Sequence, residues 1–369
     1  MKKGLWLKVS LIFCLVASVL TINTLAASEN WNQIIANAKK EGVVVTYGTS
    51  GRLSRVGDVM KAKYGVEVKH AKMSDMELTE RIVREKEAGI NTVDFIMAED
   101  ILGVAKQLLP LRYVENFVPD MYVNVIDKDY LEPLVFLVQP RTILYNTEAY
   151  KKCPVTNLWE LTTEKWRGKV IIRDPEITST NISFFAEIVA RADEMAAAYK
   201  KYFGQEIKLT TPNAGWEFLK RLAQNKVVTV GSDDDVAEAV GTRGQSAPPI
   251  GFSTVGKLRL NEEQNLVLGV AEGIVPTNGY HYPAYGLIVS NAPHPNAAKL
   301  LVRTLLEDEG AKAWTQDMGN FSTNPNNSYN SDNPFGGLDV WKKITWPLRL
   351  NVSAQLSRDV LDFWILNRN

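Results

Sequence analysis

The chain has 369 residues, of which 45% are hydrophobic and 23% charged, the balance of a globular protein with enough apolar mass for two lobes. Basic and acidic residues number 42 each, so no overall field attracts nucleic acid, and we expect no nucleic-acid partner. Electrostatic recognition of any other partner must therefore be local.

The N-terminus has the pattern of a cleavable secretory signal peptide over residues 1–27. Three lysines within the first eight residues precede an apolar run at 11–20 and a small-residue stretch at 24–27. The apolar run is about half the roughly 20 residues that span a bilayer as a helix. We therefore expect a soluble periplasmic protein that begins near Ser28; the alternative is a buried N-terminal helix.

Two cysteines occur, and one of them, Cys14, lies inside the apolar run of the signal. The bulky Phe13 before it is unlike a lipid-anchor site. Removal of the signal leaves Cys153 alone, so no internal disulfide is expected.

The first hundred residues alternate strands with amphipathic helices. A β-branched strand at 43–47 is followed by a polar loop and a helix, and a second strand follows at 66–70. Ser74 and Glu77 form a capping box that opens the next helix, and a third strand occupies 93–97. This alternation predicts a parallel sheet with helices on both faces.

The rest of the chain continues the α/β pattern less regularly. We expect strands at 134–138, 142–145, 170–172, 227–230 and 286–290, helices near 158 and 182 and at 236–240, 296–306 and 340–369, and a loop at 320–337.

Several segments, in order, are similar to one known family. Lys63-Tyr64-Gly65-Val66 closes the first strand–helix–strand unit, and Trp166-Arg167-Gly168-Lys169 precedes Arg173-Asp174-Pro175. The most specific segment is Asn291-Ala292-Pro293-His294-Pro295-Asn296, at a late strand-to-helix junction. Together, from about residue 31 to 314, these segments resemble the iron(III)-type branch of periplasmic ABC solute-binding proteins. Members of that branch also bind phosphorylated sugars, phosphonates and other small anions.

The resemblance implies a type II periplasmic binding fold: two α/β lobes, each with a mixed, mostly parallel sheet, joined by crossing hinge strands. We expect lobe 1 at 28–138 plus 279–325 and lobe 2 at 139–278 plus 326–369. The implied function is capture of a small anionic solute in the interlobe cleft by hinge closure, for an ABC permease in the inner membrane. A monomer without a cofactor is expected.

Two hydroxyl-rich loops at expected helix starts are candidate anion sites. Thr49, Ser50 and Arg52 offer hydroxyls, backbone N–H groups and a guanidinium able to bind carboxylate or phosphate in a fork. From the other lobe, the second loop offers Thr178, Ser179 and Thr180. Ordinary helix capping is the alternative for both loops.

Arg141, where the resemblance places the hinge, would face the cleft or else be a surface arginine. Asp233, at an expected helix start, would stabilise the helix dipole or receive an amino group of the ligand. Glu99, at the end of the third strand, has the same two interpretations.

Tyr280 and Tyr282 alternate along an extended segment, so both could contact a ligand while His281 points away; packing of the rings is the alternative. Iron-binding members of the family carry adjacent tyrosines after a strand and helix like those at 227–240. Here residues 241–249 contain no tyrosine and supply Arg243, which favours an anionic organic ligand over a ferric ion. No metal site is expected, although a ferric ion in a non-standard site stays open.

An enzymatic function finds little support. The histidines after the signal, at 70, 281 and 294, lack zinc-site spacing, and no Gly-x-Ser-x-Gly elbow occurs. Cys153 as a nucleophile is the one enzyme hypothesis, and we expect no enzyme. A periplasmic subunit that senses ligand for a membrane histidine kinase is the remaining alternative.

Overall fold

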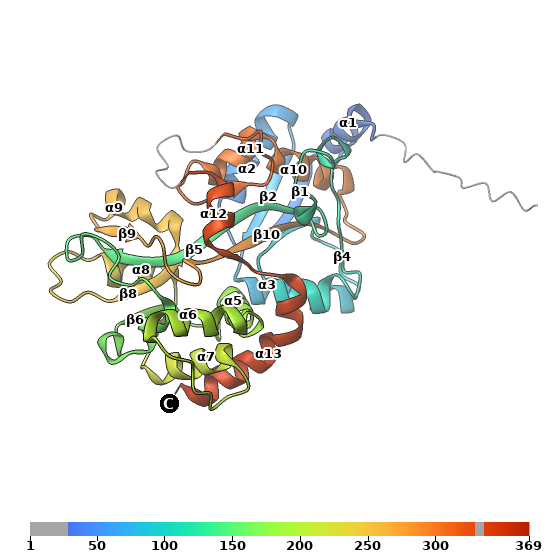
Figure 1. The fold of residues 1–369 in the computed structure, drawn as a ribbon. Helices are drawn as coiled ribbons and strands as arrows, with labels where there is room; N and C mark the ends of the chain where they lie inside the picture. The colour runs from blue at the N-terminus through green and yellow to red at the C-terminus, as the bar shows by residue number, and fades with distance from the viewer. Residues whose placement is uncertain (1–28, 329–335, 369) are drawn as a thin grey trace, which may run out of the picture.

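The computed structural model describes residues 29–328 and 336–368, so the predicted signal peptide lies outside the described residues. The described chain forms a mixed β-sheet with helices on both sides (Figure 1). The main path of the sheet runs β2-β1-β3-β10-β5-β8-β6-β7. The expected α/β fold with a mixed sheet is therefore confirmed.

The first part of the sheet contains the parallel strands β1 (Val43–Gly48), β2 (Glu67–Lys72) and β3 (Phe95–Ala98). The predicted capping box exists, since the Glu77 amide donates to Ser74 Oγ and the Ser74 amide to Glu77 Oε2. The helices of this part are α1 (Trp31–Glu41), α2 (Leu53–Tyr64), α3 (Asp75–Glu87), α4 (Ile101–Gly103), α10 (Pro295–Leu306) and α11 (Asp308–Thr315).

The second part contains the parallel strands β6 (Val170–Arg173), β7 (Val228–Val230) and β8 (Ile250–Thr254). Near residue 158 the chain forms the short 3-10 helix η4 (Leu158–Thr162). The helices of this part are α5 (Ser179–Ala190), α6 (Ala192–Phe203), α7 (Ala214–Gln224), α8 (Asp233–Gly241) and α9 (Leu260–Glu263), and the 3-10 helix η6 (Val255–Arg259) precedes α9.

Two long antiparallel strands, β5 (Val135–Asn146) and β10 (Gly279–Val289), connect the parts (Figure 1). We predicted two strands at 134–138 and 142–145, but β5 is one strand, because Pro140 faces His281 in the ladder without breaking the pairing. Likewise β10 begins at Gly279, seven residues before the predicted start. A Cβ at Gly279 would lie 2.1 Å from the Arg141 carbonyl oxygen, so the strands approach closely there.

The described parts of the expected loop at 320–337 and helix at 340–369 are more divided than predicted, and residues 329–335 and 369 lie outside the described residues. Short strands β11 (Phe321–Ser322) and β12 (Trp346–Pro347) pair with β5 and β10, while β4 (Val114–Glu115) pairs with β10 and β9 (Leu268–Val270) with β5. Two helices, α12 (Leu338–Ile344) and α13 (Leu350–Asn367), flank β12.

The C-terminal helix α13 packs against both parts of the molecule. It contacts α5 and α7 on one side and α4 on the other. Trp364 is fully buried, with its ring centroid 4.8 Å from that of Phe185. Between residues 29 and 328, and from 336 to 368, no helix is both long and apolar enough to cross a membrane.

Candidate functional site

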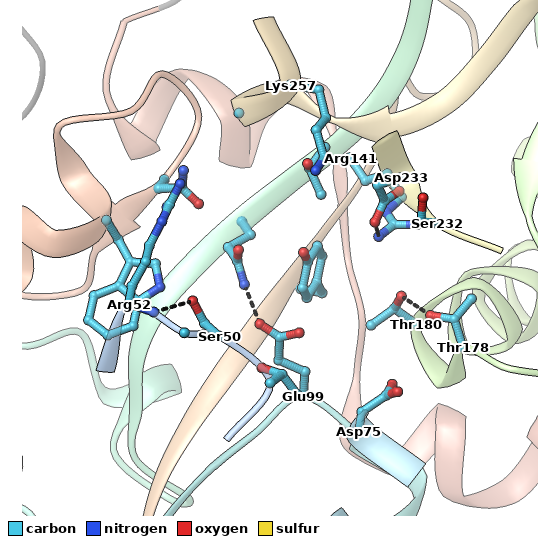
Figure 2. Close-up of a pocket in the computed structure, with 18 of the residues that line it drawn as sticks. Ser50, Arg52, Asp75, Glu99, Arg141, Thr178, Thr180, Ser232, Asp233 and Lys257 are labelled. Atoms are coloured by element: carbon cyan, nitrogen blue, oxygen red, sulfur yellow. Dashed lines mark hydrogen bonds and ion pairs between the residues drawn. The ribbon is translucent and has the colours of Figure 1, made fainter. Parts of the chain in front are cut away.

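A cavity of about 750 Å³ lies between the two parts of the sheet, at the carboxyl ends of its parallel strands (Figure 2). Thr49 follows β1, Lys72 ends β2, and Glu99 follows β3. From the second part, Arg173 ends β6 and Asp233 comes shortly after β7. Since loops and helix starts gather at this edge of a parallel sheet, it is the usual place for ligand recognition.

Nine of the eleven predicted site residues line this cavity, and whether they bind a ligand stays a prediction. They are Thr49, Ser50, Arg52, Glu99, Arg141, Thr178, Thr180, Asp233 and Tyr282.

Tyr280 and Ser179 do not line the cavity. The Tyr280 ring is fully buried, because it stacks on Phe184 and its hydroxyl donates to Asn181 Oδ1 at 2.6 Å. The Ser179 hydroxyl donates to Asp75 Oδ2 at 2.9 Å, a contact between α5 and α3. The packing alternative thus describes Tyr280, and Ser179 holds a cavity residue in place.

Arg141 is a buried residue of β5, so the alternative of a surface arginine is wrong. Its side chain is 2% exposed and its Nη2 donates to Asp233 Oδ2 at 2.8 Å (Figure 2). The guanidinium carbon lies 5.7 Å from the centroid of the Tyr282 ring. Burial would lower the pKa of Arg141, but the negative charge of Asp233 raises it above its ordinary value. The buried arginine therefore stays charged.

Asp233 has a third role besides the two that the sequence suggested. Ser232 caps α8, where its hydroxyl accepts from the Asp235 amide at 3.1 Å, while Asp233 pairs with Arg141 and accepts from the Ser253 hydroxyl at 3.2 Å. The Asp233 carboxylate thus joins the start of α8 to a strand that crosses the molecule.

The wall formed by α2 and β2 is basic. Arg52 pairs with Asp317, which leaves its charge largely compensated. Arg55 and Lys72 also line the cavity, and neither forms an ion pair within the described part of the chain. Ser50 Oγ accepts from the Arg52 amide at 3.3 Å.

The opposite wall, from β6, α5 and η6, is basic as well. Arg173 forms no ion pair with a described residue, and its Nε is buried without a hydrogen-bond partner. Lys257 pairs with Asp234 at 2.8 Å, and Arg259 lies 3.6 Å from the same carboxylate. The N-terminus of α5 adds its unpaired N–H groups, because Thr178 makes no side-chain cap there and bonds to Thr180 Oγ1 instead.

Glu99 lies in the same cavity and forms no ion pair with a residue that the structure describes. Gln139 Nε2 donates to its Oε1 at 2.7 Å (Figure 2). Burial raises the pKa of Glu99 to about 7. The hydrogen bond from Gln139 lowers this pKa, and the negative charge of Asp75 raises it. Glu99 is therefore a carboxyl group that titrates near neutral pH.

The sequence reasoning missed Lys72, Arg173, Arg55, Lys257 and Arg259, which line the cavity. A signal existed for the first two: each is the last residue of a strand in a predicted parallel group, the position that faces the ligand edge. The η6 residues had no such signal, because a short 3-10 turn after a strand has no hydrophobic periodicity.

The absence of tyrosines from residues 241–249 does not argue against a ferric ion, as the sequence had suggested. The tyrosine-free residues 241–249 follow α8 at its far end from the cavity and do not line it, and Arg243 is bonded to Asn265 and lies 3.6 Å from Glu148. Their content therefore says nothing about the ligand. Tyr282 is the one tyrosine among the lining residues, and among residues 29–328 and 336–368 no group of three His, Cys, Asp or Glu could hold a metal ion.

The Cys153 side chain lies outside the cavity and is half-buried. Burial raises the pKa of its thiol to about 11, so the reactive thiolate is disfavoured at neutral pH. The structure gives the nucleophile hypothesis no support.

Comparison with solved structures shows the two-lobed fold of type II periplasmic binding proteins. Iron-bound HitA from Pseudomonas aeruginosa is 14% identical with a TM-score of 0.67, over 88% of this chain and 99% of that chain. A Trichodesmium protein (IdiA, FutA) with iron and citrate is 18% identical, TM-score 0.62, over 88% and 99%. An ABC-transporter substrate-binding protein from Agrobacterium tumefaciens is 14% identical, TM-score 0.67, over 89% and 94%.

The family follows from the sequence itself. The model of the bacterial extracellular solute-binding protein family matches residues 55–334, and the chain belongs to that family. A search of curated proteins gave no match. The predicted relation to periplasmic solute-binding proteins is thus confirmed.

Proposed function

We propose that this protein captures a small anionic solute, phosphorylated or carboxylated, in the cavity between its lobes and delivers it to an ABC permease. The observation that carries the proposal is the charge of the cavity. Among the described residues, seven basic and four acidic side chains line it. Of the basic ones, Arg55, Lys72 and Arg173 have no carboxylate partner among the described residues.

An uncompensated cation is costly where water is limited, so a ligand that supplies negative charge would be favoured there. The starts of α2, α3, α5 and α8 all contribute lining residues, and helix N-termini attract anions. Both walls would then contact one solute. This is the arrangement in which ligand binding favours closure.

The predicted lobe boundaries complete the proposal. Lobe 1 would comprise 28–138 plus 279–325, and lobe 2 139–278 plus 326–369, with β5 as one of the crossing strands. Cavity residues from β1, β2 and β3 would then move against those from β6 and β8 when the hinge closes.

The experiment is a thermal-shift screen of phosphate esters, phosphonates and carboxylates, followed by calorimetric titration with the best binder. A ligand at a hundredfold excess over its Kd adds about 2.7 kcal/mol of stability. Arg173→Met should weaken binding by about tenfold to hundredfold, because it removes a charge-assisted hydrogen bond. Arg167→Met, at an exposed arginine outside the cavity, is the matched control.

Equal affinity of the Arg173→Met and Arg167→Met proteins would contradict the proposal. The Arg173→Met protein should also melt no lower than the wild type without ligand, since it loses an unpaired cation from a basic cavity. A lower melting temperature would mean that Arg173 is structural.

A ferric ion is the second candidate. HitA is iron-bound and the Trichodesmium protein holds iron with citrate, and here Tyr282, Glu99 and Asp75 bring phenol and carboxyl oxygens to one cavity. Ferric citrate belongs in the same screen, and binding of ferric citrate but of no iron-free anion would favour this candidate. Coupling to a permease, as opposed to a sensor kinase, is tested by solute uptake in vesicles that contain the permease.

A further inference from the structure

The charges left in the cavity after internal pairing are of both signs. Arg52, Arg141, Lys257 and Arg259 all have carboxylate partners. Three basic residues do not, as described above. Two acidic lining residues, Asp75 and Glu99, also form no ion pair with any residue in 29–328 or 336–368. A purely anionic solute would match the three unpaired basic residues but not Asp75 and Glu99.

Asp75 and Glu99 lie together in one region of the cavity. Figure 2 shows both below the group formed by Arg141, Asp233 and Lys257. Asp75 is 6% exposed and receives the Ser179 hydroxyl, and Glu99 receives the Gln139 amide. Each carboxylate is thus oriented by a neutral donor, while neither forms an ion pair within the described part of the chain.

The two carboxyl groups are close enough to influence each other. The negative charge of Asp75 contributes to the raised pKa of Glu99. The other groups around Glu99 are Arg141 and Gln139 from β5, Tyr282 from β10 and Thr49 after β1. Of these, the cation Arg141 is already held by Asp233.

We propose that the solute is zwitterionic: besides its anionic group, it carries an ammonium or similar cationic nitrogen that binds between Glu99 and Asp75. The anionic group then meets Arg173 and the start of α5 on one wall and Lys72 and Arg55 on the other. This inference rests on the proposed function and specifies its solute class.

The inference fixes the sign of the pH dependence. An ammonium needs the ionised form of Glu99, so the affinity for an amine-bearing solute should fall as the pH drops below about 7. An amine-free carboxylate, which stays ionised between pH 7.5 and 6, should show the opposite trend, since protonation of Glu99 removes a negative charge from its surroundings. The loss for the amine approaches about tenfold per pH unit below the pKa.

The test uses matched probes that differ in one amino group. Calorimetric titration at pH 7.5 would compare phosphoethanolamine with ethyl phosphate, 2-aminoethylphosphonate with ethylphosphonate, and β-alanine with propionate. We expect the amine-bearing member to bind about tenfold to hundredfold more tightly in at least one pair, as charge-assisted hydrogen bonds do. That preference should decline at pH 6.

The Glu99→Gln and Asp75→Asn variants should reduce the preference for the amine and leave the affinity for the amine-free member equal or higher. Glu132→Gln, an exposed glutamate outside this cavity, is the control. A preference that survives in both cavity variants overturns the inference.

The failures of the two proposals are distinguishable. If amine-free probes bind as tightly as their partners, the solute is a simple anion: the zwitterion inference fails and the proposed function stands. If no probe of either kind binds, both fail.

Discussion

Replacement of Asp233 by Asn should destabilise the unliganded protein and at the same time enlarge the stabilisation that an anion gives. Asp233 is 13% exposed and compensates the guanidinium of Arg141, which is 2% exposed. Breaking a buried pair by removing one partner costs about 3–5 kcal/mol. Asn retains an acceptor oxygen, and Asn181 Oδ1 still accepts from Arg141, so we expect the lower value, about 3 kcal/mol.

The melting temperature follows from this loss. With about 2.1 cal/mol/K of unfolding entropy per residue, a chain of this length has ~0.8 kcal/mol/K, so 3 kcal/mol lowers the melting temperature by about 4 °C. Scanning calorimetry with and without the anion identified by the screen is the assay. Bound anion should replace the missing charge beside Arg141 and recover much of the loss.

The neighbouring Asp234→Asn is the matched control. Asp234 is 47% exposed and its partner Lys257 is 13% exposed, so this loss should stay below about 1 kcal/mol. Equal melting temperatures of the Asp233→Asn and Asp234→Asn proteins would refute this reasoning. They would show that the buried Arg141–Asp233 pair contributes no more stability than the exposed Lys257–Asp234 pair.

Two further predictions concern β10. Burial, with the charges of Lys342 and Arg191, lowers the pKa of His281 to about 4, so the unfolded chain binds more protons between pH 6.5 and 4 and stability falls as the pH falls. His281→Gln should remove about 2 kcal/mol of the stability loss between pH 7.5 and 5, measured by urea unfolding at pH 7.5, 6 and 5; an unchanged loss would contradict it. Gly279→Ala should cost more than about 2 kcal/mol, because its φ is +150° and the new Cβ would meet the Arg141 carbonyl. Gly337→Ala has open space around it and should cost less than about 1 kcal/mol in the same assay, the effect of alanine at the N-cap of α12.

The fold was largely predictable because its local signals agree with its packing. The capping box at Ser74 and the strand at 43–48 appear as their residues indicate. The long strands β5 and β10 were predicted too short, since Pro140 and Gly279 normally end strands. Here ladder pairing on both sides of β5, with β8 and β10, outweighs those local preferences.

The site residues that lie in loops directly before helices were predictable from the sequence. The contacts that these residues form with distant residues were not. Thr49 and Thr178 were found because loops before helices have a recognisable composition. No pattern could show that Arg52 is neutralised by Asp317, or that Tyr280 turns away to Asn181, since those partners lie 265 and 99 residues away. Which charges stay free for a solute is thus decided by tertiary contacts.

The place of β10 in the sheet also constrains the order in which the molecule can form. Ile96 of β3 pairs with Leu287, α10 packs on α1 and β1, and α11 packs on α2. The N-terminal third cannot complete its core during synthesis until those late segments have been made, and such long-range pairing is slow to form. Folding of the first part is therefore expected to wait for the C-terminal third of the chain.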